Sequence, residues 1–296
     1  MELRVLKYFL MVAREENITK AARLLHITQP TLSRQLMRLE AELGVKLLNR
    51  GKYSVSLTQD GMLLKRRAQE LVSLSEKTMK ELSNKDGPLS GEISIGCGET
   101  KSMSILADQI ASFQSEHPLV QFNIYSAIAD DIKERIEKGL LDMGLLTEPI
   151  NIGKYEFARL PLKETWGVLV RADSALASKE SVEAGDLRDM PLLMGMRELV
   201  KNELTSWFGN DYEQLHVSAT YNLIVNAAAM VRSGVGVALC LDLGVTYDGL
   251  VFVPLAPALE TGSVLVWKKN QTQSDVVSYF LRHVKDPNLG ISHDQA

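Results

Sequence analysis

Residues 19–44 read TKAARLLHITQPTLSRQLMRLEAELG, and this stretch decides how the first part of the chain folds. A short helix is expected over about 19–25, followed by a tight turn. Thr28 is a good N-cap for a second helix, Pro30 is tolerated in its first turn, and Gly44 ends it. Two helices joined in this way describe a helix-turn-helix, whose second helix can enter the major groove of DNA.

The two faces of this second helix differ in composition. Its leucines form one apolar stripe, and at about 100° per residue Pro30, Arg34 and Arg38 lie on the opposite face. The side chains of a type that reaches base edges or phosphates are Gln29, Thr31, Ser33, Arg34 and Gln35. Lys46, Arg50 and Lys52 are expected to flank this surface and meet the DNA backbone. On these residues alone, an ordinary solvated helix face is the alternative.

The flanking segments complete a small domain. An amphipathic helix is expected over 2–15, a two-stranded wing over 49–57, and a longer helix over 58–83. Apolar and small positions of the last helix alternate at spacings of four and three: Leu64, Ala68, Leu71, Ser75, Thr78 and Leu82. This heptad-like seam is too short to be stable alone, so it predicts pairing with a second copy of the chain. Packing on its own domain is the alternative.

The segment 84–88, NKDGP, is rich in turn residues and is expected to be a linker. Strands are expected beyond it over 92–97, 120–125, 143–146, 165–170 and 235–241. Helices are expected over 101–116, 130–139, 199–208 and 223–233. Alternation of this kind predicts an α/β architecture with a largely parallel sheet.

Composition limits the class of protein. The chain has 296 residues, 45% hydrophobic and 24% charged, which is typical of a globular protein of two or three domains. Its apolar runs fall short of the ~20 residues that a membrane span needs. The first residues lack the apolar core of a signal peptide, so a cytoplasmic protein without a membrane partner is expected. Two cysteines exclude a disulfide framework and a four-cysteine zinc site.

Charge is divided unevenly along the chain. Residues 1–88 carry 16 Lys and Arg against 10 Asp and Glu, whereas the remainder carries 17 against 27. The balances are therefore +6 and −10. A basic piece joined to an acidic piece is the pattern expected when only the first meets a polyanion.

The stretch 3–61 strongly resembles the N-terminal domain of LysR-type transcriptional regulators. The resemblance is carried by LKYF at 6–9, TKAA at 19–22, LHITQPTLSRQ at 25–35, LEAELGVKL at 39–47 and LTQDG at 57–61. A looser resemblance extends over 91–286, through GEISIG at 91–96, GLLDMGL at 139–145 and SGVGVAL at 233–239. The chain departs from the family at Leu48-Asn49, in a wing poorer in arginine, and at Cys240, where the family has proline.

The resemblance implies an α/β protein with an N-terminal winged helix-turn-helix, a dimerising linker helix and a C-terminal effector-binding domain. That domain has two α/β subdomains, like periplasmic binding proteins. The implied division is 1–58, 59–87 and 88–296. Subdomain I then covers about 91–162 and 268–296, and subdomain II about 163–267.

The resemblance also implies partners and site residues. The implied partners are double-stranded DNA with an interrupted palindromic site, a small-molecule effector, and copies of the chain in a homodimer or homotetramer. The implied DNA-binding residues are Thr19, Gln29, Pro30, Thr31, Ser33, Arg34, Gln35, Arg38, Arg50 and Lys52. The implied effector-binding residues are Glu99, Thr100, Lys101, Ser102, Ile128, Thr147, Met194, Met196 and Asn226.

The expected cleft has two opposing electrostatic features. The amides at the start of the helix near 101, with the hydroxyls of Thr100 and Ser102, form an anion-friendly pocket to which Lys101 adds charge. Glu99 argues for a cationic or hydroxylated ligand instead. Plain packing or capping is the alternative for each of these residues.

Other chemistry has weaker support. The segment 98–102, GETKS, lacks the glycines of a nucleotide phosphate loop, and Gly234-Val235-Gly236 lacks the third glycine of a dinucleotide site. The five histidines are not at metal-ligand spacings, and no catalytic residue, metal or cofactor is expected. A redox switch between Cys97 and Cys240 is a minor possibility. The alternatives to a regulator are an enzyme with an appended DNA-binding domain and a non-specific architectural DNA binder.

Overall fold

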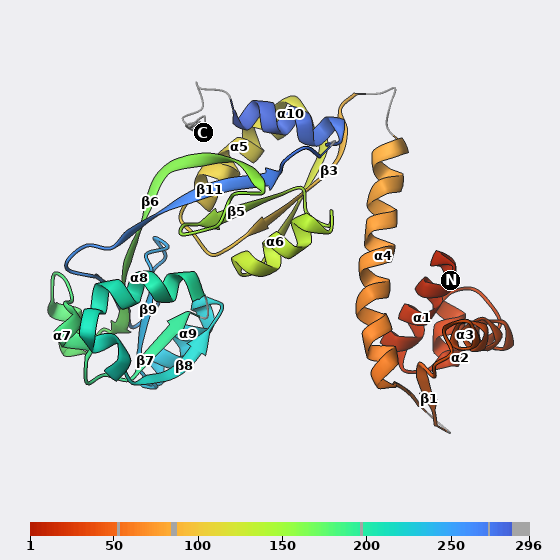
Figure 1. Ribbon diagram of the computed structural model, residues 1–296, viewed down its shortest axis with the longest axis horizontal. Helices are drawn as coiled ribbons and strands as arrows, with labels where there is room; N and C mark the ends of the chain where they lie inside the picture. Colours follow the sequence, from red (N-terminus) through yellow and green to blue (C-terminus); the bar gives the residue numbers. More distant parts are fainter. Residues whose placement is uncertain (52–53, 84–87, 196–197, 272, 286–296) are drawn as a thin grey trace. The chain divides into compact units, whose positions relative to one another are not determined.

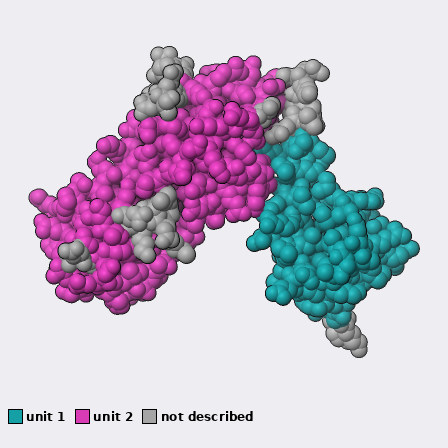
Figure 2. Space-filling view, in the orientation of Figure 1, with its two compact units in different colours: residues 1–85 teal, residues 86–296 magenta. Residues whose placement is uncertain are grey.

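The computed structural model describes residues 1–51, 54–195, 198–271 and 273–285 except for 84–87, and gives only the backbone of 80–83, 198–202 and 210–211. Lys52 and Met196 lie outside the described residues. The chain divides into two compact units, Met1–Lys85 and Asp86–Ala296 (Figure 2). The division falls inside the turn-rich segment expected to be a linker.

The first unit contains four helices and a wing. The elements are α1 (Leu3–Glu15), α2 (Ile18–Leu24), α3 (Gln29–Leu43), β1 (Leu48–Arg50), β2 (Val55–Leu57) and α4 (Gln59–Ser83). β1 and β2 form an antiparallel pair in which Leu48 lies opposite Leu57. The core is built around the fully buried Phe9, Leu32 and Leu36, which come from α1 and α3. Each expected helix and the wing therefore lie within one or two residues of the expected positions.

Helix α4 divides its apolar residues between two environments. Ala68 is fully buried in the core of the first unit, and Leu64 packs against that core. Farther along, Leu71, Leu74 and Met79 are exposed. Part of the seam expected to face a second copy of the chain therefore packs on the unit's own core. This was the alternative to pairing between copies. Among the described apolar side chains of the second half of the helix, Val72 packs against the core, whereas the other three lie in solvent.

The described residues of the second unit form a mixed α/β structure around nine strands. Its strands are β3 (Ser90–Cys97), β4 (Leu119–Ser126), β5 (Met143–Thr147), β6 (Tyr155–Arg171), β7 (Leu192–Gly195), β8 (Val217–Tyr221), β9 (Val237–Leu241), β10 (Leu250–Pro254) and β11 (Glu260–Lys268). Its helices are α5 (Met103–Glu116), α6 (Ala129–Glu137), α7 (Ala184–Leu187), α8 (Glu198–Phe208), α9 (Ile224–Arg232) and α10 (Asp275–Val284), with short 3-10 turns at Ala175–Ser178 and Gly209–Gln214.

The sheet is less parallel than expected. The strand order is β4-β3-β5-β11-β6-β9-β7-β8, and β10 also pairs with β6. β3 is parallel to β4 and β5, and β7 is parallel to β8 and β9. Every pair that involves β6 or β11 is antiparallel. The expectation of a largely parallel sheet failed because these two strands run in opposite directions through the middle of the unit.

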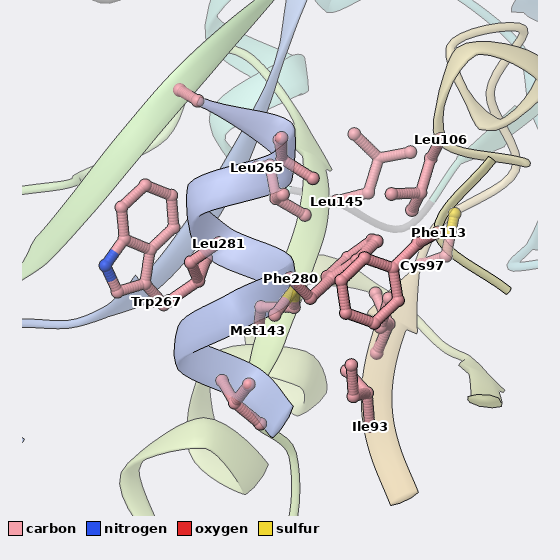
Figure 3. Packing of buried hydrophobic residues seen from close by; sticks show 14 of the residues in the cluster. Ile93, Cys97, Leu106, Phe113, Met143, Leu145, Leu265, Trp267, Phe280 and Leu281 are labelled. Carbon is pink, nitrogen blue, oxygen red and sulfur yellow. The ribbon is translucent and has the colours of Figure 1, made fainter. Parts of the chain in front are cut away.

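The second unit has two lobes, which β6 and β11 connect (Figure 1). Lobe A contains β3, β4, β5, α5, α6 and α10; lobe B contains β7 to β10 and α7 to α9. Lobe A packs α5 and α10 against the sheet, with Phe113 and Phe280 edge to face at 5.2 Å between ring centroids (Figure 3). Lobe B has its own buried clusters, centred on residues such as Val168 and Leu193.

Candidate functional site

The turn between α2 and α3 is fixed by local hydrogen bonds. Asn17 caps α2 by accepting a hydrogen bond from the Lys20 amide at 2.9 Å. His26 adopts a left-handed conformation with φ of 54°, which reverses the chain direction. Thr28 then caps α3, its hydroxyl accepting from the Thr31 amide at 3.4 Å. Such caps contribute about 1 kcal/mol each and set the angle at which α3 leaves the turn.

The outer face of α3 is available to a partner. Leu32, Leu36 and Leu39 are buried, so Arg34 and Arg38 project from the opposite, exposed side. Thr19, Gln29 and Pro30 are also exposed, whereas Thr31, Ser33 and Gln35 are partly buried. The structure therefore brings the expected DNA-facing residues of α2 and α3 to the surface around one helix-turn-helix.

Arg50 holds the wing against α3. Its guanidinium donates to Glu40 Oε2 at 3.1 Å and to Ser33 Oγ at 3.2 Å. Glu40 is 4% exposed, and its other oxygen accepts from the amides of Leu47 and Leu48 at 2.9 and 3.2 Å. Sequence reasoning missed Glu40, although an acidic residue amid the leucines of α3 was visible. Arg50 thus has a structural role, with its side chain still about one third exposed.

A cavity of about 150 Å³ lies in the second unit between segments of both lobes. Its lining residues are Gly98, Glu99, Ala127, Ile128, Ala129, Leu146, Thr147, Trp166, Gly195, Tyr221, Asn222, Ile224, Leu239, Cys240, Leu241 and Leu243. Most of these side chains are apolar, and Glu99 is the one charged residue among the described lining residues. An apolar cavity with a few polar groups is the usual form of a small-molecule site.

Glu99 joins the two lobes across this cavity. It follows β3 in lobe A, and its Oε2 accepts a hydrogen bond at 2.6 Å from the backbone N–H of Ile224, the first residue of α9 in lobe B. Burial raises the pKa of Glu99 above its ordinary value, and the hydrogen bond from Ile224 opposes this shift only in part.

The expected anion pocket at the start of α5 is already filled by the chain's own carboxylate. Glu164 of β6 is fully buried, and its oxygens accept from the amides of Lys101 and Ser102, each at 3.1 Å. The hydroxyls of Ser102 and Ser263 donate to Glu164 Oε1 at 2.7 and 3.3 Å, and the hydroxyl of Thr100 also donates to it. The expectation of an open anion pocket is therefore not met, since its donors are bound to Glu164.

The cationic group expected in the pocket is also paired. Lys101 forms an ion pair with Asp242, which follows β9, so this contact also links the two lobes. Thr100, Lys101 and Ser102 are absent from the lining of the cavity. Their side chains hold the turn between β3 and α5 in place instead.

The remaining expected effector residues divide in the same way. Ile128 and Thr147 line the cavity, whereas Met194 is buried in the core of lobe B and Asn226 is exposed on α9. Sequence reasoning missed Trp166, Tyr221 and Asn222, which line the cavity. Trp166 lies in an expected strand, but no local signal in the sequence showed which face of that strand borders a cavity.

Both cysteines are buried free thiols. Burial raises the pKa of Cys97 to about 12, and the nearby charge of Glu164 adds to the effect. Burial likewise raises the pKa of Cys240 to about 12. Thiols of this kind are poor nucleophiles, which counts against the redox switch considered above.

The described residues contain neither a metal site nor a membrane-spanning helix. No group of three or more His, Cys, Asp and Glu there is arranged to hold a metal ion. No helix in the described part of the chain has the length and apolar character needed to cross a membrane.

Comparison with protein families places two matches on the two units. Residues 3–62 match the family described as "Bacterial regulatory helix-turn-helix protein, lysR family". Residues 86–287 match the family described as "LysR substrate binding domain". Together the two matches cover nearly the whole described chain.

Individual relatives agree with these matches. The chain is 32% identical to the transcriptional regulator IlvY of Escherichia coli over 81% of each chain. It is 29% identical to the transcriptional regulator YybE of Bacillus subtilis over 96% of this chain and 98% of the relative.

A solved structure shows the same fold over the whole length. The crystal structure of CbnR, a LysR family transcriptional regulator, matches with a TM-score of 0.78 and 20% identity over 98% of this chain and 99% of CbnR. A second structure, of full-length CbnR complexed with its target DNA, matches with a TM-score of 0.76 at 21% identity over 96% and 98% of the two chains.

Proposed function

Because this chain belongs to the LysR family of DNA-binding transcriptional regulators, we propose that it reads a specific DNA sequence and that a small molecule in the cavity controls this activity. The observation that carries the proposal is the exposed face of α3, where Arg34 and Arg38 stand opposite a buried leucine stripe. Arginine at such positions can make bidentate hydrogen bonds to guanine or hold the helix in register on phosphates. The protein acts in the cytoplasm, where it meets DNA.

The proposed DNA contacts come from three elements. Thr19 at the start of α2 lies near the DNA backbone, and the outer residues of α3 enter the major groove. Arg50 positions the wing through Glu40 and meets phosphate with the remainder of its guanidinium. Lys52, which lies outside the described residues, is proposed to meet phosphate as well. The net charge of +6 over residues 1–88 supports attraction to DNA.

The proposed organisation has three parts. Residues 1–58 bind DNA, α4 with the segment to 87 dimerises and links, and 88–296 bind the effector. Within the last part, subdomain I covers about 91–162 and 268–296, and subdomain II about 163–267. The separate buried clusters support the start of subdomain II near 163, whereas Val264, Val266 and Trp267 of β11 pack in the clusters of lobe A.

We propose a dimer through the exposed second half of α4, and a tetramer as two such dimers. The exposed side chains of Leu71, Leu74 and Met79 support a helix pair there. The double variant Leu71→Lys/Leu74→Lys should shift the mass measured by light scattering toward the monomer, whereas the control Gln69→Lys, also exposed on α4, should leave it unchanged. An unchanged mass in both variants would place the contact elsewhere.

A small molecule would act by a shift in population. The cavity is lined from both lobes, so a ligand that contacts both favours one lobe arrangement over others. DNA affinity changes only as far as the ligand distinguishes between those arrangements. The alternative functions, an enzyme with an added DNA-binding domain and an architectural DNA binder, predict turnover and weak sequence discrimination, respectively.

The test is to capture sheared genomic DNA with the purified full-length protein at about 150 mM salt, where non-specific phosphate binding is weakened. We expect a few enriched sites that share an interrupted palindrome. Diffuse retention would support the architectural alternative. Turnover of a metabolite would support the enzyme alternative.

A further inference from the structure

The cavity of the second unit has an unusual balance of charge. Among its described lining residues, Glu99 carries the only formal charge, and the walls around it are mostly apolar. Lys101, two residues after Glu99, does not neutralise the charge of Glu99, because its ammonium group is bound to Asp242. A ligand entering this cavity therefore meets a negative group in apolar surroundings.

Two helices that begin near the cavity, α5 and α9, already have a carboxylate of the chain bound at their N-termini. Glu164 accepts the amides at the start of α5, and Glu99 accepts the first amide of α9. The first turn of α6 also contains acidic residues, Asp130 and Asp131, although both are exposed, Asp130 is paired with Lys133, and no side chain caps this helix. The positive ends of helix dipoles normally favour an anionic ligand, but here the chain's own acidic groups offset them.

Glu99 itself has capacity to bind a further donor. Its one hydrogen-bond partner among the described residues is the Ile224 amide, which occupies Oε2. A carboxylate can accept several hydrogen bonds, so Oε1 remains for a ligand. The raised pKa of Glu99, caused first by burial, shows that its charge is poorly compensated without a ligand.

We propose that the effector of this protein is a small organic cation, whose ammonium group binds Glu99 and whose apolar body packs between Ile128, Leu146 and Trp166. This inference rests on the proposed function, since it names the chemical class of the effector. The ammonium would add the missing counter-charge at Glu99, and charge-assisted hydrogen bonds are the strong ones. The cavity volume of about 150 Å³ limits the apolar body to about the size of one benzene ring.

Bound there, the cation would also bear on the arrangement of the lobes. Glu99 joins lobe A to the start of α9 in lobe B through one hydrogen bond. A cation shared between Glu99 and the lobe B wall adds to the links that Glu99 makes with Ile224 and Lys101 with Asp242, so its binding favours the lobe arrangement in which all of these form.

The test compares three single-ring probes of similar size but different charge on the full-length protein: benzylamine, benzyl alcohol and benzoate. Binding is measured by calorimetry and by the change in tryptophan fluorescence, to which Trp166 in the cavity wall contributes. We expect benzylamine to bind about tenfold more tightly than either other probe. The preference should fall to about twofold or less in Glu99→Gln, while benzyl alcohol binding stays unchanged. The control Glu180→Gln, an exposed carboxylate outside the cavity, should keep the full preference.

The outcomes separate this inference from the proposed function. Equal binding of the three probes, preference for benzoate, or no binding of benzylamine at about 10 mM, well above the affinity expected of a specific ligand of this size, overturns the cation proposal. The wild-type comparison decides this even if Glu99→Gln is poorly folded. Enrichment of palindromic genomic sites by the same protein sample would leave the regulator function standing in that case. Absence of such enrichment overturns the proposed function instead.

Discussion

Ser102 donates two hydrogen bonds to one oxygen of Glu164, from its backbone N at 3.1 Å and from its Oγ at 2.7 Å. The two residues are 62 positions apart, and both are fully buried. Glu164 therefore ties the start of α5 in lobe A to the strand that leads into lobe B. The carboxylate of Glu164 thus occupies the amide and hydroxyl donors that would otherwise attract an anion from solution.

Replacing this carboxylate should destabilise the second unit strongly. In Glu164→Ala the hydroxyls of Thr100 and Ser102 and two backbone amides lose their acceptor in a buried place. We expect a loss of about 3–5 kcal/mol in the free energy of unfolding, and about half as much in Glu164→Gln, which keeps one acceptor oxygen. Urea titration followed by tryptophan fluorescence is specific for this unit, because all three tryptophans, Trp166, Trp207 and Trp267, lie in it. Equal stability of Glu164→Ala and Glu180→Ala would contradict the role given to the carboxylate.

Arg34 should determine DNA affinity. Its side chain is exposed on α3, and its one hydrogen bond among the described residues is to the Pro30 carbonyl at 3.4 Å within the helix. We expect Arg34→Ala to cost about 1–3 kcal/mol of binding to an enriched site. Fluorescence anisotropy at fixed salt measures this, with Arg66→Ala on α4 as the control. An affinity unchanged in Arg34→Ala means that α3 is not the reading element.

The contact between Arg50 and Glu40 should matter for stability as well as for binding. Arg50→Ala leaves the nearly buried carboxylate of Glu40 with only two backbone amides. Because the arginine is itself about one third exposed, we expect a cost of about 1–2 kcal/mol, less than for a fully buried pair. Thermal unfolding followed by the helical circular dichroism signal checks this. A melting curve identical to that of wild type would show that the wing does not depend on the pair.

The two cysteines should be unreactive in the folded protein. With pKa values raised to about 12 by burial, their thiolate fraction at pH 8 is about one in ten thousand, against about one in ten for an ordinary thiol. Mass spectrometry after iodoacetamide treatment at pH 8 should find no adduct on Cys97 or Cys240 until urea unfolds the protein. Rapid labelling of native protein would revive a redox role.

Glu99 should make the second unit less stable as the pH rises. Its pKa is raised in the folded state, so the folded protein retains this proton at pH values where the unfolded chain has lost it. Ionisation of Glu99 therefore lowers the free energy of unfolding as the pH rises from the ordinary value of 4.5 through the raised value. Glu99→Gln removes this loss, so the variant should gain on wild type between about pH 4.5 and pH 7. Urea titrations of both proteins at these two pH values test the sign, and a constant difference would contradict it.

Local signals in the sequence were enough for the first unit. Thr28 and Gly44 mark the ends of α3 by capping rules that depend on near neighbours, and the structure confirms both. The leucine stripe of α3 likewise predicted its buried face. The family resemblance extended this to the fold of the whole chain, which the comparisons confirm.

Long-range contacts account for what was missed. The elements that were not expected are β7, β8, β10, β11, α7 and α10, and β6 is more than twice as long as the segment 165–170 expected within it. β11 exists because it pairs with both β5 and β6, which lie about a hundred residues earlier in the chain. The bond from Ser102 to Glu164 depends on the same kind of approach. No local pattern could show that the donors near 101 would be occupied by a carboxylate of β6.

The pairing of β6 with β11 brings together the two points at which the chain enters and leaves lobe B. Thr165, where the chain enters lobe B, lies directly opposite Glu260, where it returns. The whole of lobe B is thus an insertion whose two ends meet as neighbours in one sheet. A segment with adjoining ends can be exchanged for another without moving the ends of the host. About half of the cavity wall therefore comes from one contiguous segment, which another segment with the same ends can replace while lobe A and the helix-turn-helix stay as they are.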